Sequence, residues 1–211
     1  MNIGICGGTF DPFHRGHVDP ILAVRPALAW DRVIYMPAFV QPFKAGRSTA
    51  SGYHRFAMTV LGTEGHGPLY VSSRELERGS VSYTVDTLQE LRAQEPDATL
   101  DWIIGDDNLE QLLEWKSLDT IFTLANFVVL TRMNVRPALP GLLGARVTEA
   151  MHRPPQGSIV FAGNATVPVS STEVRRRIRA GEPIEDLVPP PVSRYIHHYD
   201  LYGKGNRERF D

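Results

Sequence analysis

The sequence predicts an α/β protein with a Rossmann-like, doubly wound parallel sheet. Two observations support this fold class. Short apolar segments alternate along the chain with longer segments of helical periodicity, a pattern typical of β-α-β units. The first apolar segment also runs directly into a glycine-rich turn, Gly7-Gly8, before a helix. Ligands of such sheets bind at the carboxyl ends of the strands, so we expect the functional residues there.

The first elements form a β-α-β unit. Residues 1–6 alternate apolar and small side chains and predict a strand. Residues 18–30 predict a helix with one apolar face, in which Pro20 is tolerated if it falls in the first turn. Residues 32–36 predict the second strand, so the crossover between the strands is expected to be right-handed.

The same alternation continues to residue 104. Residues 51–61 predict a helix, on which we expect Arg55 to point outward without a catalytic role. A strand is expected at 69–72 and a helix at 85–93, which Ser82 and Thr84 can cap. The next strand is expected at 99–104, and a further helix follows Asn108.

The last third begins with a strand rich in Val and Leu at 125–131. Residues 133–157 are rich in Pro and Gly and predict mainly connection, with a helix at 145–151. We then expect a strand at 158–161, a helix opened by the segment from Pro168 to Arg175, and a terminal helix at 192–199. A chain of 211 residues fits one domain, here 1–202, followed by a polar tail at 203–211.

The composition excludes several classes of protein. The 22 basic and 24 acidic residues give a net charge of −2, which favours neither a nucleic-acid nor a membrane partner. No apolar run approaches the ~18 residues of a spanning helix. The single Cys6 cannot form an internal disulfide, and the first residues predict a strand and not a leader. We therefore expect a cytoplasmic protein; its oligomeric state stays open.

The turn after the first strand has the features of an anion site. Gly7 and Gly8 let the backbone turn sharply and expose N–H groups. His14 and His17 are three residues apart, which places both rings on one face of a first helical turn, beside an N-terminus that favours anions. Hydrogen-bond donors on this face indicate neutralisation of a phosphate more than proton abstraction.

Two other interpretations of this turn remain. It could be an ordinary strand-turn-helix element with two uninvolved histidines. It could also be a zinc site made of Cys6, His14 and His17, although a structural zinc usually takes four ligands and the chain has no second cysteine.

The segment G-G-T-F-D-P-F-H-R-G-H at 7–17 resembles the first motif of the nucleotidylyltransferase superfamily, with its (H/T)-x-G-H signature. It is most similar to that of bacterial nicotinate-mononucleotide adenylyltransferases. The resemblance implies a nucleotidylyltransferase-type sheet that binds ATP and nicotinate mononucleotide. Within this motif, it implies that ATP is bound by Gly7, Gly8, Thr9, Phe10, His14 and His17, of which the two histidines are catalytic.

Four later segments resemble motifs of the same family. At 41–44, Q-P-F-K stands where the family has P-P-H-K; Lys44 matches as a catalytic and mononucleotide-binding cation, whereas Gln41 and Phe43 depart. S-Y-T-x-D-T-L at 82–88 implies that Thr84 contacts the substrate carboxylate. Beyond the next strand, the resemblance assigns Gly105 and Asp107 to ATP and Trp115 and Lys116 to the mononucleotide. Asp106 is an unusual residue between the first two.

The fourth segment, V-S-S-T-E-V-R at 169–175, resembles I-S-S-T-x-I-R. Ser170 and Glu173 have the spacing of a capping box, which is the structural explanation of this segment. The resemblance adds a cradle for the ATP phosphates formed by Ser171, Thr172 and Arg175, with Arg175 catalytic.

The implied reaction transfers the adenylyl group of ATP to nicotinate mononucleotide without a covalent intermediate, and releases deamido-NAD and pyrophosphate. Mg²⁺ is expected to arrive with ATP, and no resident metal is expected. Two rivals remain: an adenylyltransferase for nicotinamide mononucleotide or pantetheine phosphate, and a nucleotide-binding sensor that has lost turnover.

Overall fold

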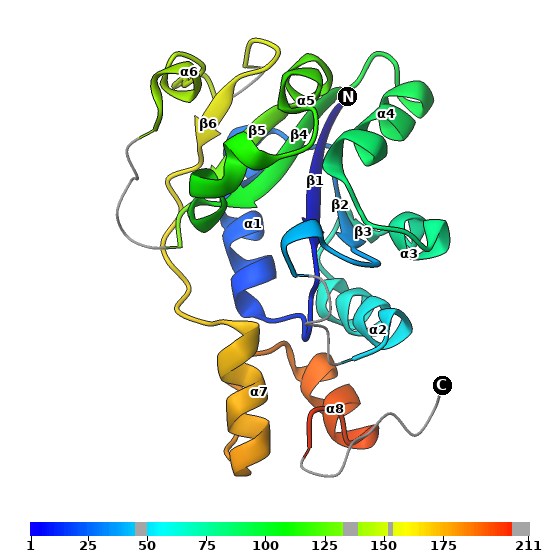
Figure 1. Cartoon of the computed structure of the whole chain (residues 1–211). Helices are drawn as coiled ribbons and strands as arrows, with labels where there is room; N and C mark the ends of the chain where they lie inside the picture. Colours follow the sequence, from blue (N-terminus) through cyan, green and yellow to red (C-terminus); the bar gives the residue numbers. More distant parts are fainter. Residues whose placement is uncertain (45–49, 133–138, 152–153, 204–211) are drawn as a thin grey trace.

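The computed structural model describes residues 1–44, 50–132, 139–151 and 154–203, with the backbone alone at Lys44. Its centre is a six-stranded sheet in the order β3-β2-β1-β4-β5-β6 (Figure 1), and every neighbouring pair is parallel. The strands are β1 (Asn2–Gly8), β2 (Arg32–Pro37), β3 (Leu69–Val71), β4 (Thr99–Gly105), β5 (Asn126–Leu130) and β6 (Ile159–Phe161). The predicted fold class is confirmed, and each predicted strand is present within two residues of its expected bounds.

Helices cover both faces of the sheet. The helices are α1 (Arg15–Leu28), α2 (Gly52–Thr63), α3 (Arg74–Arg78), α4 (Thr84–Gln94), α5 (Leu118–Leu124), α6 (Gly141–Gly144), α7 (Ser171–Ala180) and α8 (Pro190–His198), and two 3₁₀ helices are η1 (Pro42–Lys44) and η2 (Asp106–Glu114). Successive side chains of a strand point to opposite faces, which divides the buried residues into two layers. Cys6, Tyr35 and Val128 pack with α1 and α2, whereas Ile3 and Ile5 pack with α4, η2 and α5.

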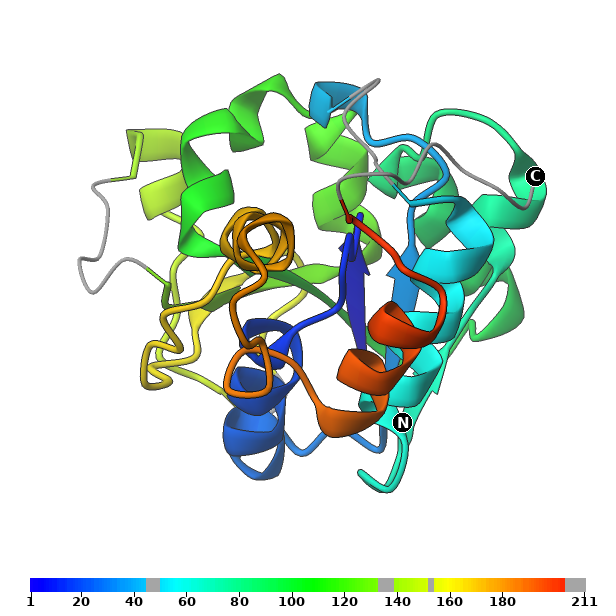
Figure 2. The same cartoon turned by 90° about the horizontal axis from the view of Figure 1, so that it is seen from below.

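The strand order reverses between β1 and β4. The chain first moves outward from β1 through β2 to β3, and then returns to β4 on the other side of β1 and moves outward to β6. The loops after β1 and β4 therefore diverge at neighbouring strand ends, which opens a crevice at the carboxyl edge. In Figure 1 the carboxyl edge of the sheet points downward, and α7 and α8 lie at this lower end of the molecule. The view from below in Figure 2 shows α8 beside α2.

Four local predictions were wrong. The helix expected at 145–151 is absent, because Val147 forms a bridge with Ile159 and the N–H of Thr148 donates to the Ile159 carbonyl, so this segment pairs with the edge of the sheet. Pro20 lies in the second turn of α1, because that helix begins at Arg15. Arg55 points inward and is 2% exposed. Neither Ser82 nor Thr84 caps α4, because Tyr83 holds the cap position and makes no side-chain bond there.

The short helices α3 and α5 were not predicted from the sequence. Each has fewer than eight residues, too few for a clear helical period. In the described part of the chain, no helix is both long and apolar enough to cross a membrane. Residues 204–211 of the predicted tail lie outside the described residues.

Candidate functional site

A cavity of about 430 Å³ opens at the carboxyl ends of the central strands. Its walls come from the β1 turn, the loop after β2, the start of α4, the β4–η2 segment and the start of α7. Eleven residues predicted from the sequence as site residues contribute to these walls: Gly7, Gly8, Thr9, Phe10, His17, Thr84, Gly105, Asp107, Trp115, Lys116 and Ser171. Residues from both ends of the sequence thus meet in one place.

The glycines of the opening turn leave room for large side chains. A Cβ atom on Gly7 would lie 2.7 Å from Trp102 Cζ2, and one on Gly8 would lie 2.8 Å from the Phe10 ring. Phe10 itself is 2% exposed and packs edge-on against Tyr35, so it supports the turn from below. The backbone of this turn, and not the Phe10 ring, is therefore the part that a phosphate can contact.

His14 and His17 stack at the start of α1. Their ring centroids are 3.6 Å apart, and His17 also packs edge-on against Phe10 at 5.0 Å. The Nδ1 atom of His17 accepts a hydrogen bond of 3.1 Å from the backbone N–H of His14. This bond assigns the ring proton of neutral His17 to Nε2, which makes Nε2 a donor. Of the two rings, only that of His17 lines the cavity.

His14 is buried behind His17. It is 4% exposed, and in the described structure its Nδ1 atom makes no hydrogen bond. Burial, and then the charge of Arg132, lower the pKa of His14 to about 3. The ring is therefore neutral at physiological pH, and it packs against the His17 ring where the sequence suggested neutralisation of charge.

The start of α7 packs directly on the opening loop. The Ser171 hydroxyl donates to the Pro12 carbonyl at 3.0 Å, and Arg175 donates to the Asp11 carbonyl at 2.6 Å. The Ser170 hydroxyl accepts from the backbone N–H of Glu173, which is one half of the predicted capping box; the Glu173 side chain bonds Arg176 and Arg177. Ser171 lines the cavity, whereas Arg175 and the exposed Thr172 lie at the loop outside its wall.

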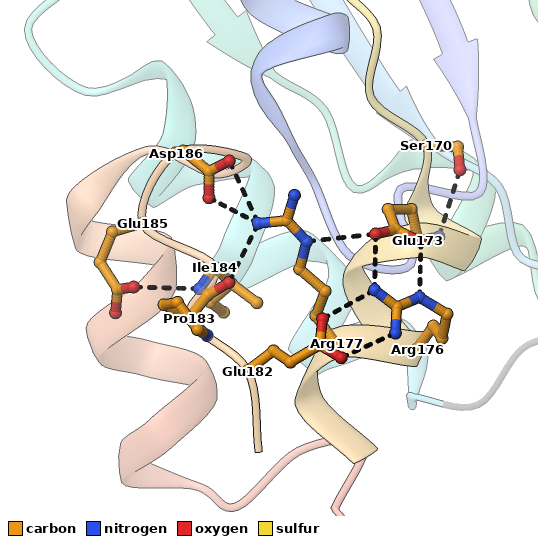
Figure 3. A network of polar contacts seen from close by, with 9 residues as sticks. All are labelled: Ser170, Glu173, Arg176, Arg177, Glu182, Pro183, Ile184, Glu185 and Asp186. Atoms are coloured by element: carbon orange, nitrogen blue, oxygen red, sulfur yellow. Dashed lines mark hydrogen bonds and ion pairs between the residues drawn. The ribbon is translucent and has the colours of Figure 1, made fainter. Parts of the chain in front are cut away.

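Glu173 lies in the first turn of α7, where a carboxylate would repel a phosphate. Figure 3 shows that it faces two arginines: Arg176 donates to it at 2.8 Å and Arg177 at 3.1 Å. Arg176 also pairs with Glu182, and Arg177 with Asp186. This network neutralises Glu173 and connects α7 to the loop that leads to α8.

The network gives a pH-dependent contribution to stability. Hydrogen bonds from Arg176 and then Arg177 lower the pKa of Glu173 to about 2, whereas an unfolded glutamate titrates near 4.3. The stabilisation is therefore present above the unfolded value and is lost as the pH falls toward 2. We expect Glu173→Gln to lower the melting temperature near neutral pH and to flatten its decline between about pH 6 and pH 2. Exposed Glu110→Gln on η2 is the control, and equal profiles for the two variants would contradict this role.

The opposite wall of the cavity is formed by α4 and the end of η2. Thr84 is the first residue of α4, where the helix dipole favours an anion. Trp115 is half-buried and packs edge-on against Phe127 at 5.9 Å. Lys116 Nζ lies 4.4 Å from the centre of the Tyr83 ring and 3.2 Å from Asp86. Thr84, Trp115 and Lys116 thus line the same cavity.

Glu75 is a cavity residue that sequence reasoning missed. It is 3% exposed, and it accepts a hydrogen bond of 2.7 Å from Thr87. Burial raises its pKa, and hydrogen bonds from Thr87 and Ser82 oppose that shift. Ser82 also accepts from the backbone N–H of Phe39, so this cluster ties α3 and α4 to the loop after β2. No pattern in the sequence indicated Glu75, because α3 has only five residues and was not predicted.

Arg132 is the second missed residue. Its backbone N–H donates to Asp106 Oδ2 at 3.0 Å, and its side chain lies 3.5 Å from Asp107. Buried Asp106, whose departure from the family pattern was unexplained, thus joins the ends of β4 and β5. Arg132 lies two residues after the end of β5, and the rule that ligands bind at strand carboxyl ends could have identified it.

The loop after β2 is described as far as the backbone of Lys44. Gln41 Oε1 accepts a hydrogen bond of 2.8 Å from the Thr9 hydroxyl, and Gln41, Pro42 and Phe43 line the cavity. Phe43 is 44% exposed and places an aromatic ring where the family pattern has histidine. The side chain of Lys44 lies outside the described structure, so its predicted role stays a prediction.

The described residues contain no group of three or more His, Cys, Asp and Glu that could hold a metal ion. Cys6 is buried within β1, and burial raises the pKa of its thiol to about 12, which disfavours the thiolate form that zinc requires.

The chain matches the model of the cytidylyltransferase-like family over residues 5–177. It is 39% identical over 210 residues to a probable nicotinate-nucleotide adenylyltransferase from Thermoanaerobacter sp. (strain X514), an alignment that covers 97% of this chain and 95% of the relative. A relative with the same description from Pectobacterium atrosepticum is 38% identical over 205 residues, which are 93% of this chain and 96% of the relative.

Solved structures share the fold. The Plasmodium falciparum nicotinic acid mononucleotide adenylyltransferase complexed with NaAD has a TM-score of 0.71 at 18% identity, with coverage of 95% of this chain and 97% of that one. The same protein complexed with APC has a TM-score of 0.70 at 17% identity, with coverage of 95% and 96%.

Proposed function

Because the chain belongs to the cytidylyltransferase-like family, and within it to the nicotinate-nucleotide adenylyltransferases, we propose that it transfers the adenylyl group of ATP to nicotinate mononucleotide. The products are deamido-NAD and pyrophosphate, as in NAD biosynthesis. The observation that carries this proposal is that residues proposed for ATP and residues proposed for the mononucleotide line one cavity. The turn of β1 with His17 forms one part of its wall, and Thr84, Trp115 and Lys116 form another.

The proposed division of the cavity follows from these walls. ATP lies against the β1 turn and the β4–η2 segment, with its phosphates near His17 and the start of α7. The mononucleotide lies with its ring on Trp115 and its phosphate toward the loop after β2, where Lys44 is proposed to bind it. The two phosphates that must react then meet near the carboxyl end of β1.

The reaction needs positioning and charge stabilisation more than a strong base. A phosphate monoester has its second pKa near 6, so the attacking oxygen is already ionised at neutral pH. That oxygen forms a bond to the α-phosphorus of ATP while the bond to pyrophosphate breaks. Two unit charges 4 Å apart repel by about 4 kcal/mol at an effective dielectric of 20. His17, Lys44 and Arg175 are proposed to offset this repulsion, and His14 supports the His17 ring.

A divalent metal enters this scheme as part of the nucleotide substrate. Nucleotidyltransferases of this kind generally use a divalent metal with ATP, and we propose Mg²⁺ here. The protein side chains then act on the phosphate charge that the metal leaves uncompensated. The predicted cytoplasmic location and the absence of nucleic-acid partners stay predictions.

The decisive experiment is a turnover assay with ATP and each candidate acceptor, namely nicotinate mononucleotide, nicotinamide mononucleotide and pantetheine phosphate. We expect pyrophosphate and deamido-NAD from the first acceptor at the highest kcat/KM. A higher kcat/KM with another acceptor would assign a different substrate. ATP binding by calorimetry without any product would instead indicate a nucleotide sensor.

Thr84 provides a test of how the acid is preferred over the amide. The carboxylate is proposed to accept from two donors, the Thr84 hydroxyl and a backbone N–H near Trp115 or Lys116. A carboxamide has one acceptor oxygen, so its NH₂ would face one of these donors and leave it unpaired, at a cost of about 1–3 kcal/mol. Thr84→Val keeps the shape and removes the donor. We expect it to lower the acid-to-amide ratio of kcat/KM by about tenfold to a hundredfold.

The matched control is Thr123→Val, since Thr123 donates its hydroxyl to the Thr120 carbonyl on α5, away from the cavity wall. The control should keep the wild-type ratio. If Thr84→Val also kept it, the carboxylate would have to be recognised elsewhere.

A further inference from the structure

Arg55 is a buried cation for which the proposed reaction has given no role. It lies on α2, is 2% exposed, and burial lowers its pKa, while the nearby Asp11 carboxylate opposes that shift. A guanidinium in such a place is costly unless its donors are used; here Nη1 and Nη2 donate, whereas Nε has no partner among the described residues. Its environment therefore indicates a specific task.

The two ends of the guanidinium contact two different loops. Nη1 donates to the carbonyl oxygen of Thr9 at 2.7 Å, and Nη2 lies 3.4 Å from the carbonyl oxygen of Phe39. Thr9 belongs to the β1 turn, on the side proposed for ATP. Phe39 belongs to the loop after β2, on the side proposed for the mononucleotide phosphate.

The same two loops are also joined directly by two contacts. The Ala38 N–H donates to the Gly8 carbonyl at 2.8 Å, and the Thr9 hydroxyl bonds to Gln41 at the cavity wall. Arg55 differs because its side chain does not line the cavity, and because a planar guanidinium fixes the direction of both bonds.

The carboxylate of Asp11 connects the opening loop to other parts of the chain near Arg55. Asp11 Oδ1 accepts hydrogen bonds from the Tyr202 hydroxyl at 2.7 Å and from the Ala50 N–H at 3.2 Å. The Asp11 carbonyl accepts from Arg175. The opening loop is thus held by α2, by α7 and by the segment after α8, so its position depends on parts of the chain far apart in sequence.

We propose that Arg55 is a positioning residue for adenylyl transfer: by joining Thr9 to Phe39 it sets how the two bound substrates approach each other. This inference rests on the proposed function. It predicts a defect in the step that needs both substrates, with little effect on the binding of either one alone.

The test compares Arg55→Lys and Arg55→Met with wild type. Lysine keeps the charge beside Asp11 but, as a single ammonium, cannot make the same two directed bonds. Misplacement of reacting groups by about 1 Å can cost about a hundredfold in rate. We expect kcat to fall by about tenfold to a hundredfold in both variants, while the KM of each substrate, and its binding alone by calorimetry, stay close to wild type.

Arg92→Met is the matched control. Arg92 also donates to backbone carbonyls of two segments, Ala98 at 2.6 Å and Leu124 at 2.8 Å, but next to the amino ends of β4 and β5. This control should lose thermal stability and keep kcat. A purely structural Arg55 would behave in the same way, with the activity lost only in proportion to unfolded protein.

Wild-type kcat in folded Arg55→Lys would overturn the proposal, as would a loss of ATP binding alone that accounts for the whole defect. Failure of the proposed function is a separate result, namely wild-type protein that forms no dinucleotide. In that case, amide hydrogen exchange tests the role of Arg55 without activity. Arg55→Lys should raise the exchange rates of backbone amides in both loops, residues 7–10 and 38–41. Exchange unchanged in either loop would overturn the proposal irrespective of activity.

Discussion

His17→Ala is expected to lower kcat by about a hundredfold to a thousandfold while the protein stays folded. The reason is the geometry of the ring. Its Nδ1 accepts the His14 N–H, which leaves the ring proton on Nε2, and the ring lies at the wall of the cavity where charge is proposed to develop on the phosphates. Loss of one preorganised donor of this kind costs about 3–4 kcal/mol in the transition state.

The measurement is steady-state turnover with both substrates, together with thermal unfolding of the variant. A donor used mainly in the transition state lowers kcat and kcat/KM by similar factors, and this pattern is expected here. His66→Ala, in the exposed loop before β3, is the control and should keep wild-type turnover. A folded His17→Ala protein with an unchanged rate would reject the phosphate role of His17.

Arg175→Ala is expected to weaken the use of ATP, measured as kcat/KM, more than the binding of the mononucleotide. Arg175 follows the start of α7 by one turn and reaches the Asp11 carbonyl, so it is close to the loop against which the ATP phosphates are proposed to lie. Removal of a hydrogen-bonded charge partner costs about 2 kcal/mol or more, which corresponds to roughly thirtyfold in kcat/KM for ATP.

Two further variants separate the causes. Arg175→Lys keeps the charge and should recover part of the ATP affinity, whereas a loss due only to the Asp11 contact would not be recovered. Arg179→Ala, one turn further along α7 and exposed, should leave both substrates unaffected. Equal losses for ATP and mononucleotide in Arg175→Ala would show that the two substrates are placed wrongly.

The sheet was predictable because its signals are local. Each strand is a short apolar segment bounded by polar or glycine-containing turns, and this pattern does not depend on distant residues. The errors have equally physical causes. Val147 and Thr148 have their backbone groups bonded to Ile159, a partner eleven or more residues away, and this pairing outweighed the helical pattern at 145–151.

The candidate site was predictable where its residues fall in recognisable motifs at strand ends. Thr84, Trp115 and Ser171 all line the cavity, as expected. The missed residues lack such a motif. Arg55 on its helix has the pattern of a solvent-facing charge, and Glu75 lies on a helix of five residues. Only the packing of α2 and α3 under the loops shows that both are buried.

The sequence by itself determined the parallel α/β class, the glycine turn, the spacing of His14 and His17, and the N-cap of α7, because each depends on residues adjacent along the chain. The tertiary structure decided the properties that depend on surroundings. It made His14 neutral through burial and the charge of Arg132, gave His17 its donor nitrogen through a backbone contact, and directed Arg55 inward to two loops. Desolvation and hydrogen-bond direction arise only when distant segments pack together, so no local pattern encodes them.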